Sequence, residues 1–359
     1  MQIELPISKS IANRWLMLQA IHGDELMPVS DSMPDDVQIL HRALCLIALS
    51  PHRLIDVGNC GTAMRFLTAY CTQLEGQTTI LDGVERMRHR PIGQLVDALR
   101  EIGADIEYLG EEGFPPLRIK GCILDKHRIV TINNPLSTQF VSALLLIGAK
   151  VQTDSTSPYI YITQEVIKQY QLSPFSYHLS VEKDWSSAAF WYEYVALHGG
   201  EITLLGLSRD SLQGDKIVAD IFAHLGVQTE YTAEGIILSP TANSETSNSP
   251  LSGRPIAAQA ASHSKILIQD FGSCPDLYPS VALTCECLGI ELHSTGVESL
   301  PLKESDRLRA VREHRTDHDH RMAMALLIAG YEVDDAACIS KSYPQFLEQF
   351  HRMNTLKLQ

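Results

Sequence analysis

Six segments of the chain share one pattern, in which a short polar cluster runs directly into an almost wholly apolar stretch. They are residues 8–21, 61–71, 137–149, 184–197, 275–288 and 317–330. Each opens with residues that cap helices or tolerate tight turns and then turns apolar. Because a helix that is apolar on all sides must be buried, the pattern predicts six buried helices in one or two layered domains.

Shorter segments between these helices alternate apolar and polar residues, which is typical of β-strands. We predict strands at residues 53–57, 78–83, 116–121, 127–132, 159–163, 201–206, 236–240 and 265–270. Helices and strands in this rhythm indicate an α+β or α/β architecture with repeated units. Residues 241–264 are rich in Ser, Ala, Asn and Pro without periodicity, and we predict a surface loop there.

Composition narrows the class of protein. The chain has 359 residues, enough for two or more domains. Its net charge of −14 argues against a nucleic acid or an anionic membrane as partner. The eight cysteines form no CxxC pair, which favours reduced thiols in a cytoplasmic protein. No signal peptide is visible, and the apolar runs are too short or too interrupted to span a bilayer.

The starts of the predicted helices are candidate anion sites, because unpaired N–H groups there carry partial positive charge. Four of the six starts also carry Lys or Arg in or near the first turn. Ser10 and Arg14 are four residues apart and share one helix face, with Lys9 at the entry. A solvated helix start is the alternative interpretation of this segment.

Three other basic clusters extend the pattern. Arg86, Arg88 and Arg90 alternate, so an extended backbone would direct all three to one side, although a solvated edge also explains them. Lys303 and Arg307 form an i,i+4 pair of like charge, which favours a counter-ion. A surface helix in which residue 304 pairs with residue 307 is the alternative. Lys341 precedes a predicted terminal helix.

Residues 317–321 place two histidines and Arg321 at the start of a buried helix. Zinc is the obvious alternative, because His314, His318 and His320 are close in sequence. We favour an anion site, since Arg321 at the same helix start would oppose a cation.

In their residues and in their order along the chain, these segments resemble the EPSP synthase (3-phosphoshikimate 1-carboxyvinyltransferase) family of enolpyruvyl transferases. The matching stretches are LPISKSIANR, GNCGTAMRFL, ERMRHRPIGQLVDAL, PPLRIKG, STQFVSALL, SPYIYIT, VEKDWSSAA, PDLYPSVALT, LKESDRL, DHDHRMAMA and KSYPQF. They run from residue 5 to residue 346, so the resemblance covers essentially the whole chain.

The resemblance implies an enzyme that moves the enolpyruvyl group of phosphoenolpyruvate to the 5-hydroxyl of shikimate 3-phosphate. Positions matching the shikimate 3-phosphate site are Lys9, Ser10, Arg14, Ser137, Thr138, Gln139, Thr156, Tyr159, Asp276 and Lys303. Positions matching the phosphoenolpyruvate site are Lys9, Gly61, Arg90, Gln139, Arg307, Arg321 and Lys341. Asp276, Glu304, Lys9 and His320 match groups implicated in proton transfer. No metal and no organic cofactor is implied.

The resemblance also implies a two-domain inside-out α/β barrel, in which each domain holds three βαβαββ units with helices inside and sheets outside. One domain would span residues 8–181, and the other would combine residues 1–7 with 182–359. The active site would lie in the cleft between them, and we expect a monomer. Two regions, near 164–180 and 311–316, are shorter than the strand-containing parts usual in the family.

The implied mechanism is addition–elimination with release of phosphate. Asp276, with Lys303 nearby, is the candidate base, since a carboxylate among many cations stays ionised. Glu304 or Lys9 is the candidate acid. One alternative is the related transferase acting on UDP-N-acetylglucosamine, whose usual loop cysteine pattern this chain lacks. An inactive substrate-binding relative is another.

Overall fold

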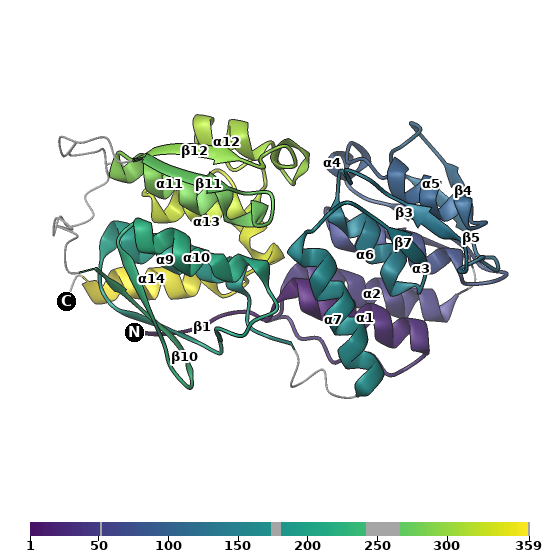
Figure 1. Ribbon diagram of the computed structural model, residues 1–359, viewed down its shortest axis with the longest axis horizontal. Coiled ribbons are helices and arrows are strands. Elements are labelled where there is room, and N and C mark those ends of the chain that lie inside the picture. The colour runs from purple at the N-terminus through teal and green to yellow at the C-terminus, as the bar shows by residue number, and fades with distance from the viewer. Residues whose placement is uncertain (51, 174–180, 242–265, 358–359) are drawn as a thin grey trace. The chain divides into compact units, whose positions relative to one another are not determined.

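The computed structural model describes residues 1–50, 52–173, 181–241 and 266–357. Its internal contacts divide the chain into two compact units, each containing helices and sheets (Figure 1). Unit 1 comprises Met1–Ser8, Ser32–Pro34 and Glu182–Gln359, and unit 2 comprises Lys9–Asp31 and Asp35–Val181. Of the predicted loop at 241–264, all but residue 241 lies outside the described residues.

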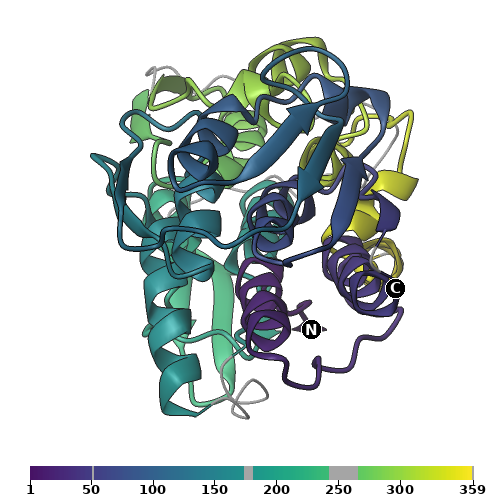
Figure 2. The ribbon, with the colours of Figure 1, turned by 90° about the vertical axis from the view of Figure 1, so that its right-hand side faces the viewer.

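Unit 2 contains two parallel strand pairs, one of which is extended by an antiparallel hairpin. Its helices are α1 (Lys9–His22), α2 (Asp35–Leu49), α3 (Gly61–Thr72), α4 (Glu85–Arg88), α5 (Gly93–Glu101), α6 (Thr138–Leu146) and α7 (Pro158–Leu172). Strands β2 (His52–Asp56), β3 (Thr78–Asp82), β4 (Asp105–Tyr108) and β5 (Leu117–Lys120) form a sheet in the order β2-β3-β5-β4. Strands β6 (Ile129–Thr131) and β7 (Lys150–Gln152) pair in parallel. In Figure 2, α1 (purple) lies between α7 and α2, and it contacts both.

Unit 1 repeats this arrangement. Its helices are α9 (Trp185–His198), α10 (Val218–His224), α11 (Tyr278–Leu288), α12 (Arg307–Glu313), α13 (His320–Ile328) and α14 (Phe346–Lys357), with 3₁₀ turns η1 (Gly214–Ile217), η2 (Pro275–Leu277), η3 (Leu300–Leu302) and η4 (Ala337–Lys341). Strands β1 (Gln2–Glu4), β8 (Ile202–Leu205), β9 (Val227–Tyr231) and β10 (Gly235–Pro240) form a sheet in the order β1-β8-β10-β9. Strands β11 (Ile266–Asp270) and β12 (Glu291–Thr295) pair in parallel. The N-terminal segment belongs to unit 1 because β1 pairs with β8.

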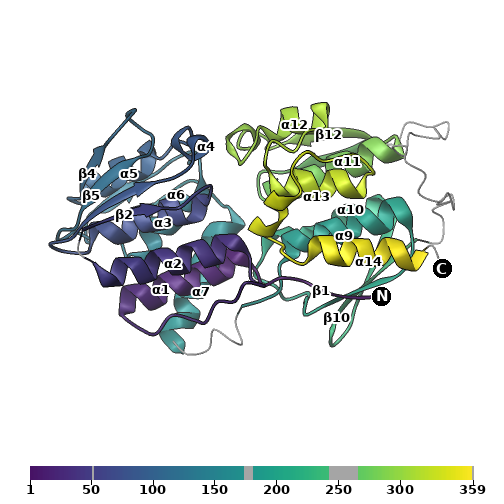
Figure 3. The same cartoon turned by 180° about the vertical axis from the view of Figure 1, so that it is seen from behind.

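All six predicted buried helices are present, as α1, α3, α6, α9, α11 and α13. Helix α9 is the clearest case, since Trp185 to Ala196 are all buried. Its Phe190 and Trp191 pack against Phe346 of α14, which runs beside it in Figure 3. Since each helix buries residues on all its sides, the helices form the interior of each unit. Among the described residues, no helix combines the length and apolarity needed to cross a membrane.

The strand predicted at residues 159–163 is wrong, because this segment is the first turn and a half of α7. Pro158 occupies a first-turn position, and the Ser157 hydroxyl accepts a hydrogen bond from the backbone N–H of Tyr159. The buried residues Ile160, Thr163 and Val166 then recur at helical spacing. The other predicted strands are present, the last of them described from Ile266 onward.

Each unit contains one complete and one shortened repeat within the described residues. The complete repeats are β2-α3-β3-α5-β4-β5 and β1-α9-β8-α10-β9-β10. The shortened ones are β6-α6-β7-α7 and β11-α11-β12-α12, each ending with a helix and without a described antiparallel pair. In place of a third full repeat, the described chain shows helices α1 and α2, which contact each other, and helices α13 and α14. The short region near 311–316 falls at the end of one shortened repeat. Of the region near 164–180, the first residues belong to α7 at the end of the other, and residues 174–180 lie outside the described residues.

Candidate functional site

Polar contacts join the starts of four helices in unit 2. The Lys9 ammonium at the start of α1 donates to Asp36 Oδ2 at 2.9 Å in the first turn of α2. The Cys60 thiol, which caps α3, donates to the backbone oxygen of Asp36 at 3.7 Å. Gln139 Nε2 at the start of α6 donates to Thr62 Oγ1 at 3.0 Å. The predicted positions Lys9 and Gln139 therefore lie at neighbouring helix N-termini, where amide dipoles favour anions.

Arg14 links α1 to α6 and α7 through neutral oxygens. Its Nε donates to Thr163 Oγ1 at 2.7 Å, and its Nη2 donates to Ser142 Oγ at 3.1 Å and to the Tyr159 carbonyl at 3.0 Å. Its Nη1 donates to the Ser10 carbonyl at 2.6 Å. Burial lowers the pKa of Arg14 to about 10, although the nearby Tyr159 opposes the shift. Arg14 therefore fixes the backbone beside two other predicted residues, Ser10 and Tyr159.

Gly61 begins α3 directly against two buried guanidinium groups. A Cβ on Gly61 would lie 2.6 Å from Arg90 Nη1, 2.8 Å from Arg90 Nη2 and 2.9 Å from Arg65 Nη1. Arg65 donates to the Gly61 carbonyl at 3.3 Å and to the Pro91 carbonyl at 3.1 Å. Arg90 Nε and Nη1 are buried without a hydrogen-bond partner among the described residues. Buried cationic donors at a helix N-terminus favour an anionic ligand.

The prediction that Arg86, Arg88 and Arg90 point to one side is wrong, because residues 85–88 form the short helix α4 instead of an extended strand. Arg86 and Arg88 are exposed, and only Arg90 is buried. The Arg88 guanidinium donates to Asp82 Oδ2 at 2.6 Å and, by this hydrogen bond, lowers the pKa of the Asp82 carboxyl. One arginine of the three therefore remains a candidate.

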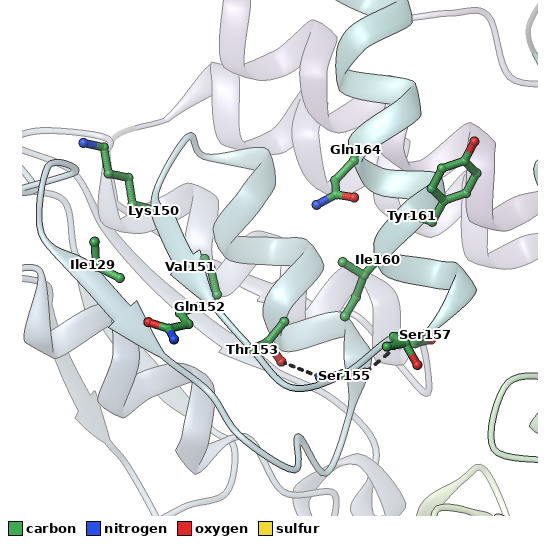
Figure 4. A pocket seen from close by; sticks show the side chains of 11 residues that line it. Ile129, Lys150, Val151, Gln152, Thr153, Ser155, Ser157, Ile160, Tyr161 and Gln164 are labelled. Carbon is green, nitrogen blue, oxygen red and sulfur yellow. Dashed lines mark hydrogen bonds between the residues drawn. The ribbon is translucent and has the colours of Figure 1, made fainter.

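The remaining predicted residues of unit 2 lie at the starts of α6 and α7. The Ser137 hydroxyl caps α6 and accepts from the backbone N–H of Gln139 at 3.3 Å, and Thr138 begins that helix. Thr156 lines a pocket of about 580 Å³ bounded by β6, β7 and the first turns of α7 (Figure 4). Lys150 and polar side chains line it too, but neither Lys9 nor Arg14 does. This pocket therefore contains one predicted residue and is not where the predicted cations gather.

In unit 1, the Asp276 carboxylate is the centre of a cationic cluster. Its Oδ1 accepts from Arg307 Nη1 at 2.8 Å and lies 3.5 Å from the Lys303 ammonium. Its Oδ2 accepts from Arg321 Nη2 at 2.9 Å. Burial lowers the pKa of Lys303, and Asp276 opposes this shift. The structure thus brings together four residues predicted from three separate segments.

Glu304 extends this cluster to the C-terminal part of the chain. Its Oε2 accepts from Arg307 Nη2 at 3.2 Å, and its Oε1 accepts from the Lys341 ammonium at 3.1 Å. Burial alone would lower the pKa of Arg307, but the carboxylates of Asp319, Asp276 and Glu304 raise it above its ordinary value. Arg307 is therefore held in its charged form.

Two further sequence interpretations need correction. Lys303 and Arg307 do not share a helix, because α12 begins at Arg307 with Asp306 as its cap; they meet at Asp276 instead. The three histidines considered for zinc also separate. His314 contacts Glu286 and His318 contacts Asp335, whereas the ring of His320 is fully buried. Across the described residues, no group of His, Cys, Asp or Glu is arranged to hold a metal ion.

Sequence reasoning missed three buried residues that contact or face the predicted set. Arg65 stands in the GTAMR stretch, and Asp319 could have been recognised as the cap of α13. Asp215, in η1, accepts from the Ser186 hydroxyl. Burial and the negative charge of Asp276 raise its pKa to about 7. No periodic signal marks Asp215, because its role depends on a turn that only the fold places beside α9.

The fold and these contacts define a class: proteins of repeated α/β units that place buried cations and carboxylates at helix N-termini to act on anionic small molecules. The sequence model of EPSP synthase (3-phosphoshikimate 1-carboxyvinyltransferase) matches residues 35–173, 146–314 and 311–350. The chain belongs to the EPSP synthase family.

Individual relatives agree with this assignment. The 3-phosphoshikimate 1-carboxyvinyltransferase of Bacteroides fragilis is 36% identical, with 98% of this chain and 94% of the relative aligned. That of Colwellia psychrerythraea is 28% identical over 98% of this chain and 96% of the relative. Among solved structures, EPSP synthase from Acinetobacter baumannii matches with a TM-score of 0.65 and 19% identity, covering 98% of this chain and 95% of that one. The enolpyruvyl transferase NikO from Streptomyces tendae matches with a TM-score of 0.61 and 12% identity, covering 98% and 94%. These two likenesses show a shared fold.

Proposed function

We propose that this protein transfers the enolpyruvyl group of phosphoenolpyruvate to the 5-hydroxyl of shikimate 3-phosphate and releases phosphate. The observation that carries this proposal is the Asp276 carboxylate held by Lys303, Arg307 and Arg321. An ionised carboxylate among cations that can bind phosphate or carboxylate groups is the arrangement that this transfer needs. The membership of the family and its named relatives support the same reaction.

We assign binding roles by the positions that match the family. Shikimate 3-phosphate would contact Lys9, Ser10, Arg14, Ser137, Thr138, Gln139, Thr156, Tyr159, Asp276 and Lys303. Phosphoenolpyruvate would contact Lys9, Gly61, Arg90, Gln139, Arg307, Arg321 and Lys341. The two substrates carry several negative charges, so guanidinium forks and helix N-termini must overcome their mutual repulsion. The Arg90 donors that lack a partner among the described residues and the missing side chain at Gly61 support this assignment.

The proposed reaction is an addition followed by an elimination. Glu304 or Lys9 gives a proton to the methylene carbon of phosphoenolpyruvate while the 5-hydroxyl oxygen bonds to the adjacent carbon and Asp276 accepts the hydroxyl proton. The adduct then loses phosphate from that carbon, and a proton from the new methyl group returns to the residue that supplied it, which forms the enolpyruvyl ether. Three cations favour the ionised form of Asp276, which suits a base. His320 is fully buried, so we give it a supporting role in proton transfer.

Each unit carries part of the proposed set, so the proposal requires both units to contact the same substrates, in the cleft that the family resemblance implies. Substrate would then draw the units together. Small-angle scattering with and without shikimate 3-phosphate and phosphoenolpyruvate tests this closure, and an unchanged radius of gyration would count against it. We also propose a cytoplasmic monomer, which a light-scattering mass of one chain would support.

A coupled assay for phosphate release tests the function directly. We expect release from phosphoenolpyruvate when shikimate 3-phosphate is added, and none with UDP-N-acetylglucosamine or without an acceptor. Release with UDP-N-acetylglucosamine would identify the other transferase activity. Calorimetric binding of shikimate 3-phosphate without any turnover would identify an inactive relative. Unchanged rates in EDTA are expected, since the proposed steps use only side chains.

A further inference from the structure

The Asp319 carboxylate connects the two arginine-bearing segments of unit 1. Its side chain is fully buried at the cap of α13. Its Oδ1 accepts from the backbone N–H of Arg321 at 2.9 Å, and its Oδ2 accepts from Arg307 Nε at 2.8 Å. The Ser305 hydroxyl donates to the same Oδ2 at 3.2 Å. One carboxylate therefore joins the first turn of α13 to the first residue of α12.

Arg307 divides its donors between this buried carboxylate and two partly exposed ones. Its Nε donates to Asp319, which is 0% exposed, and its Nη2 makes a longer contact of 3.5 Å to Oδ1 of the same residue. Nη1 donates to Asp276 and Nη2 to Glu304, which are 16% and 11% exposed. An anion that enters from solvent can compete with Asp276 and Glu304 for the Nη groups. It cannot reach the Asp319 contact, because solvent does not reach it. Asp319 is thus the fixed partner of Arg307.

We infer that Asp319 is a positioning residue for phosphoenolpyruvate, which it serves by holding the Arg307 guanidinium and the Arg321 turn of α13 in one fixed geometry. This inference rests on the proposed function. Charge-assisted hydrogen bonds in a buried site are shorter and stronger than neutral ones. A fixed Nε contact therefore leaves the Nη groups directed at the place where a substrate anion binds, and small displacements of such groups reduce binding and rate.

The alternative is that Asp319 merely caps α13, and one substitution separates the two roles. Asn caps helices about as well as Asp. Asp319→Asn therefore keeps an acceptor for the Arg321 N–H but removes the negative charge opposite Arg307 Nε. Asp306→Asn is the matched control, because Asp306 caps α12 through the Arg309 N–H at 3.1 Å in the same unit and has no described contact with the Arg307 guanidinium.

Steady-state kinetics of the wild type and both variants test the inference. We expect Asp319→Asn to raise KM for phosphoenolpyruvate about tenfold and to leave KM for shikimate 3-phosphate within about twofold. Asp306→Asn should leave both within about twofold. In an Arg307→Lys background, Asp319→Asn should add less than about twofold, because its effect acts through the guanidinium. An unchanged KM for phosphoenolpyruvate in Asp319→Asn, or fully additive effects in the double variant, would overturn the inference.

A second variant and a binding experiment cover the cases in which Asp319→Asn does not fold or the wild type is inactive. If Asp319→Asn does not fold, Ser305→Ala removes one of the hydrogen bonds to Oδ2 and should raise the same KM about two- to threefold; no change would overturn the inference. A wild type that releases no phosphate with shikimate 3-phosphate refutes the proposed function instead. In that case calorimetric titration with phosphoenolpyruvate or inorganic phosphate tests whether Asp319 is a positioning residue. Equal affinities in wild type and variant, or no binding in either, would overturn the inference.

Discussion

The two units hold their cationic side chains in opposite ways. In unit 2, the Arg14 guanidinium donates to hydroxyl and carbonyl oxygens, and Arg90 has donors without a partner in the described structure. In unit 1, Arg307 donates to three carboxylates. Burial accordingly lowers the pKa of Arg14, whereas carboxylates outweigh burial and raise the pKa of Arg307. Lys9, paired with Asp36, is the exception among the predicted binding residues of unit 2.

This difference indicates a division of labour between the units. Neutral partners stabilise a buried guanidinium without cancelling its charge, so unit 2 keeps positive charge with which to attract anions. Carboxylates in unit 1 cancel most of the positive charge but supply groups that accept and give protons. We therefore predict that substitutions of the proton-transferring carboxylates in unit 1 lower kcat most strongly, whereas substitutions of the cations in unit 2 mainly raise KM.

The largest effect is expected for Asp276→Asn. This change keeps the size of the side chain but removes the base, so kcat should fall about a thousandfold with shikimate 3-phosphate still binding. The control is Asp317→Asn, whose carboxylate contacts Arg309 and Arg315 on the surface of the same unit. Phosphate-release kinetics and calorimetric binding measure the two parts. Normal turnover in Asp276→Asn would mean that the base is misassigned.

The second effect concerns Arg90, which the comparison places in binding and not in proton transfer. Arg90→Ala should raise KM for phosphoenolpyruvate about 10- to 100-fold, because hydrogen bonds to a charged group are lost. Arg88→Ala, which removes a neighbouring exposed arginine paired with Asp82, should change KM within about twofold. Equal effects of the two substitutions in initial-rate measurements would show that burial does not distinguish these arginines.

A smaller effect on the same group is expected for Gly61→Ala. The new methyl group would lie 2.6 Å from Arg90 Nη1 and 2.9 Å from Arg65 Nη1, so both guanidinium groups must shift. Because flexible side-chain ends move at little cost, the fold should remain stable while KM for phosphoenolpyruvate rises about tenfold. Thermal unfolding and initial rates measure the two quantities. A variant that loses stability but keeps its KM would contradict the proposed contact.

Much of this arrangement could be predicted from the sequence, since the buried helices, most strands and the residues at helix starts follow local patterns. Local patterns failed where neighbouring residues decide the structure. Residues 159–163 alternate like a strand, but Ser157 and Pro158 begin a helix there. Arg86 and Arg90 separate because the turns of α4 replace an extended backbone. Asp215 has its partner Ser186 far away in sequence, so no local spacing could identify it. Asp319 can be recognised locally as the cap of α13, but its contact with Arg307 of the preceding helix cannot.

The smallest effect expected is a pH dependence of the stability of unit 1. Burial and Asp276 raise the pKa of Asp215 to about 7, above its ordinary value of 3.8. Between these two values, the unfolded carboxyl is ionised while the folded one keeps its proton. The unfolded state therefore binds fewer protons, and the free energy of unfolding should fall as pH rises through this range.

This pH-dependent contribution disappears in Asp215→Asn. When the pH is raised from 5 to 7.5, the Tm of the variant should therefore fall about 2 to 4 °C less than the Tm of the wild type. Asp210→Asn, an exposed change in the same unit, should behave as wild type does. Calorimetric unfolding could instead give the same pH profile for Asp215→Asn and wild type. That result would show that Asp215 is ionised in the folded protein. A further negative charge would then lie near Asp276, and the contrast between the cation partners of the two units would have to be revised.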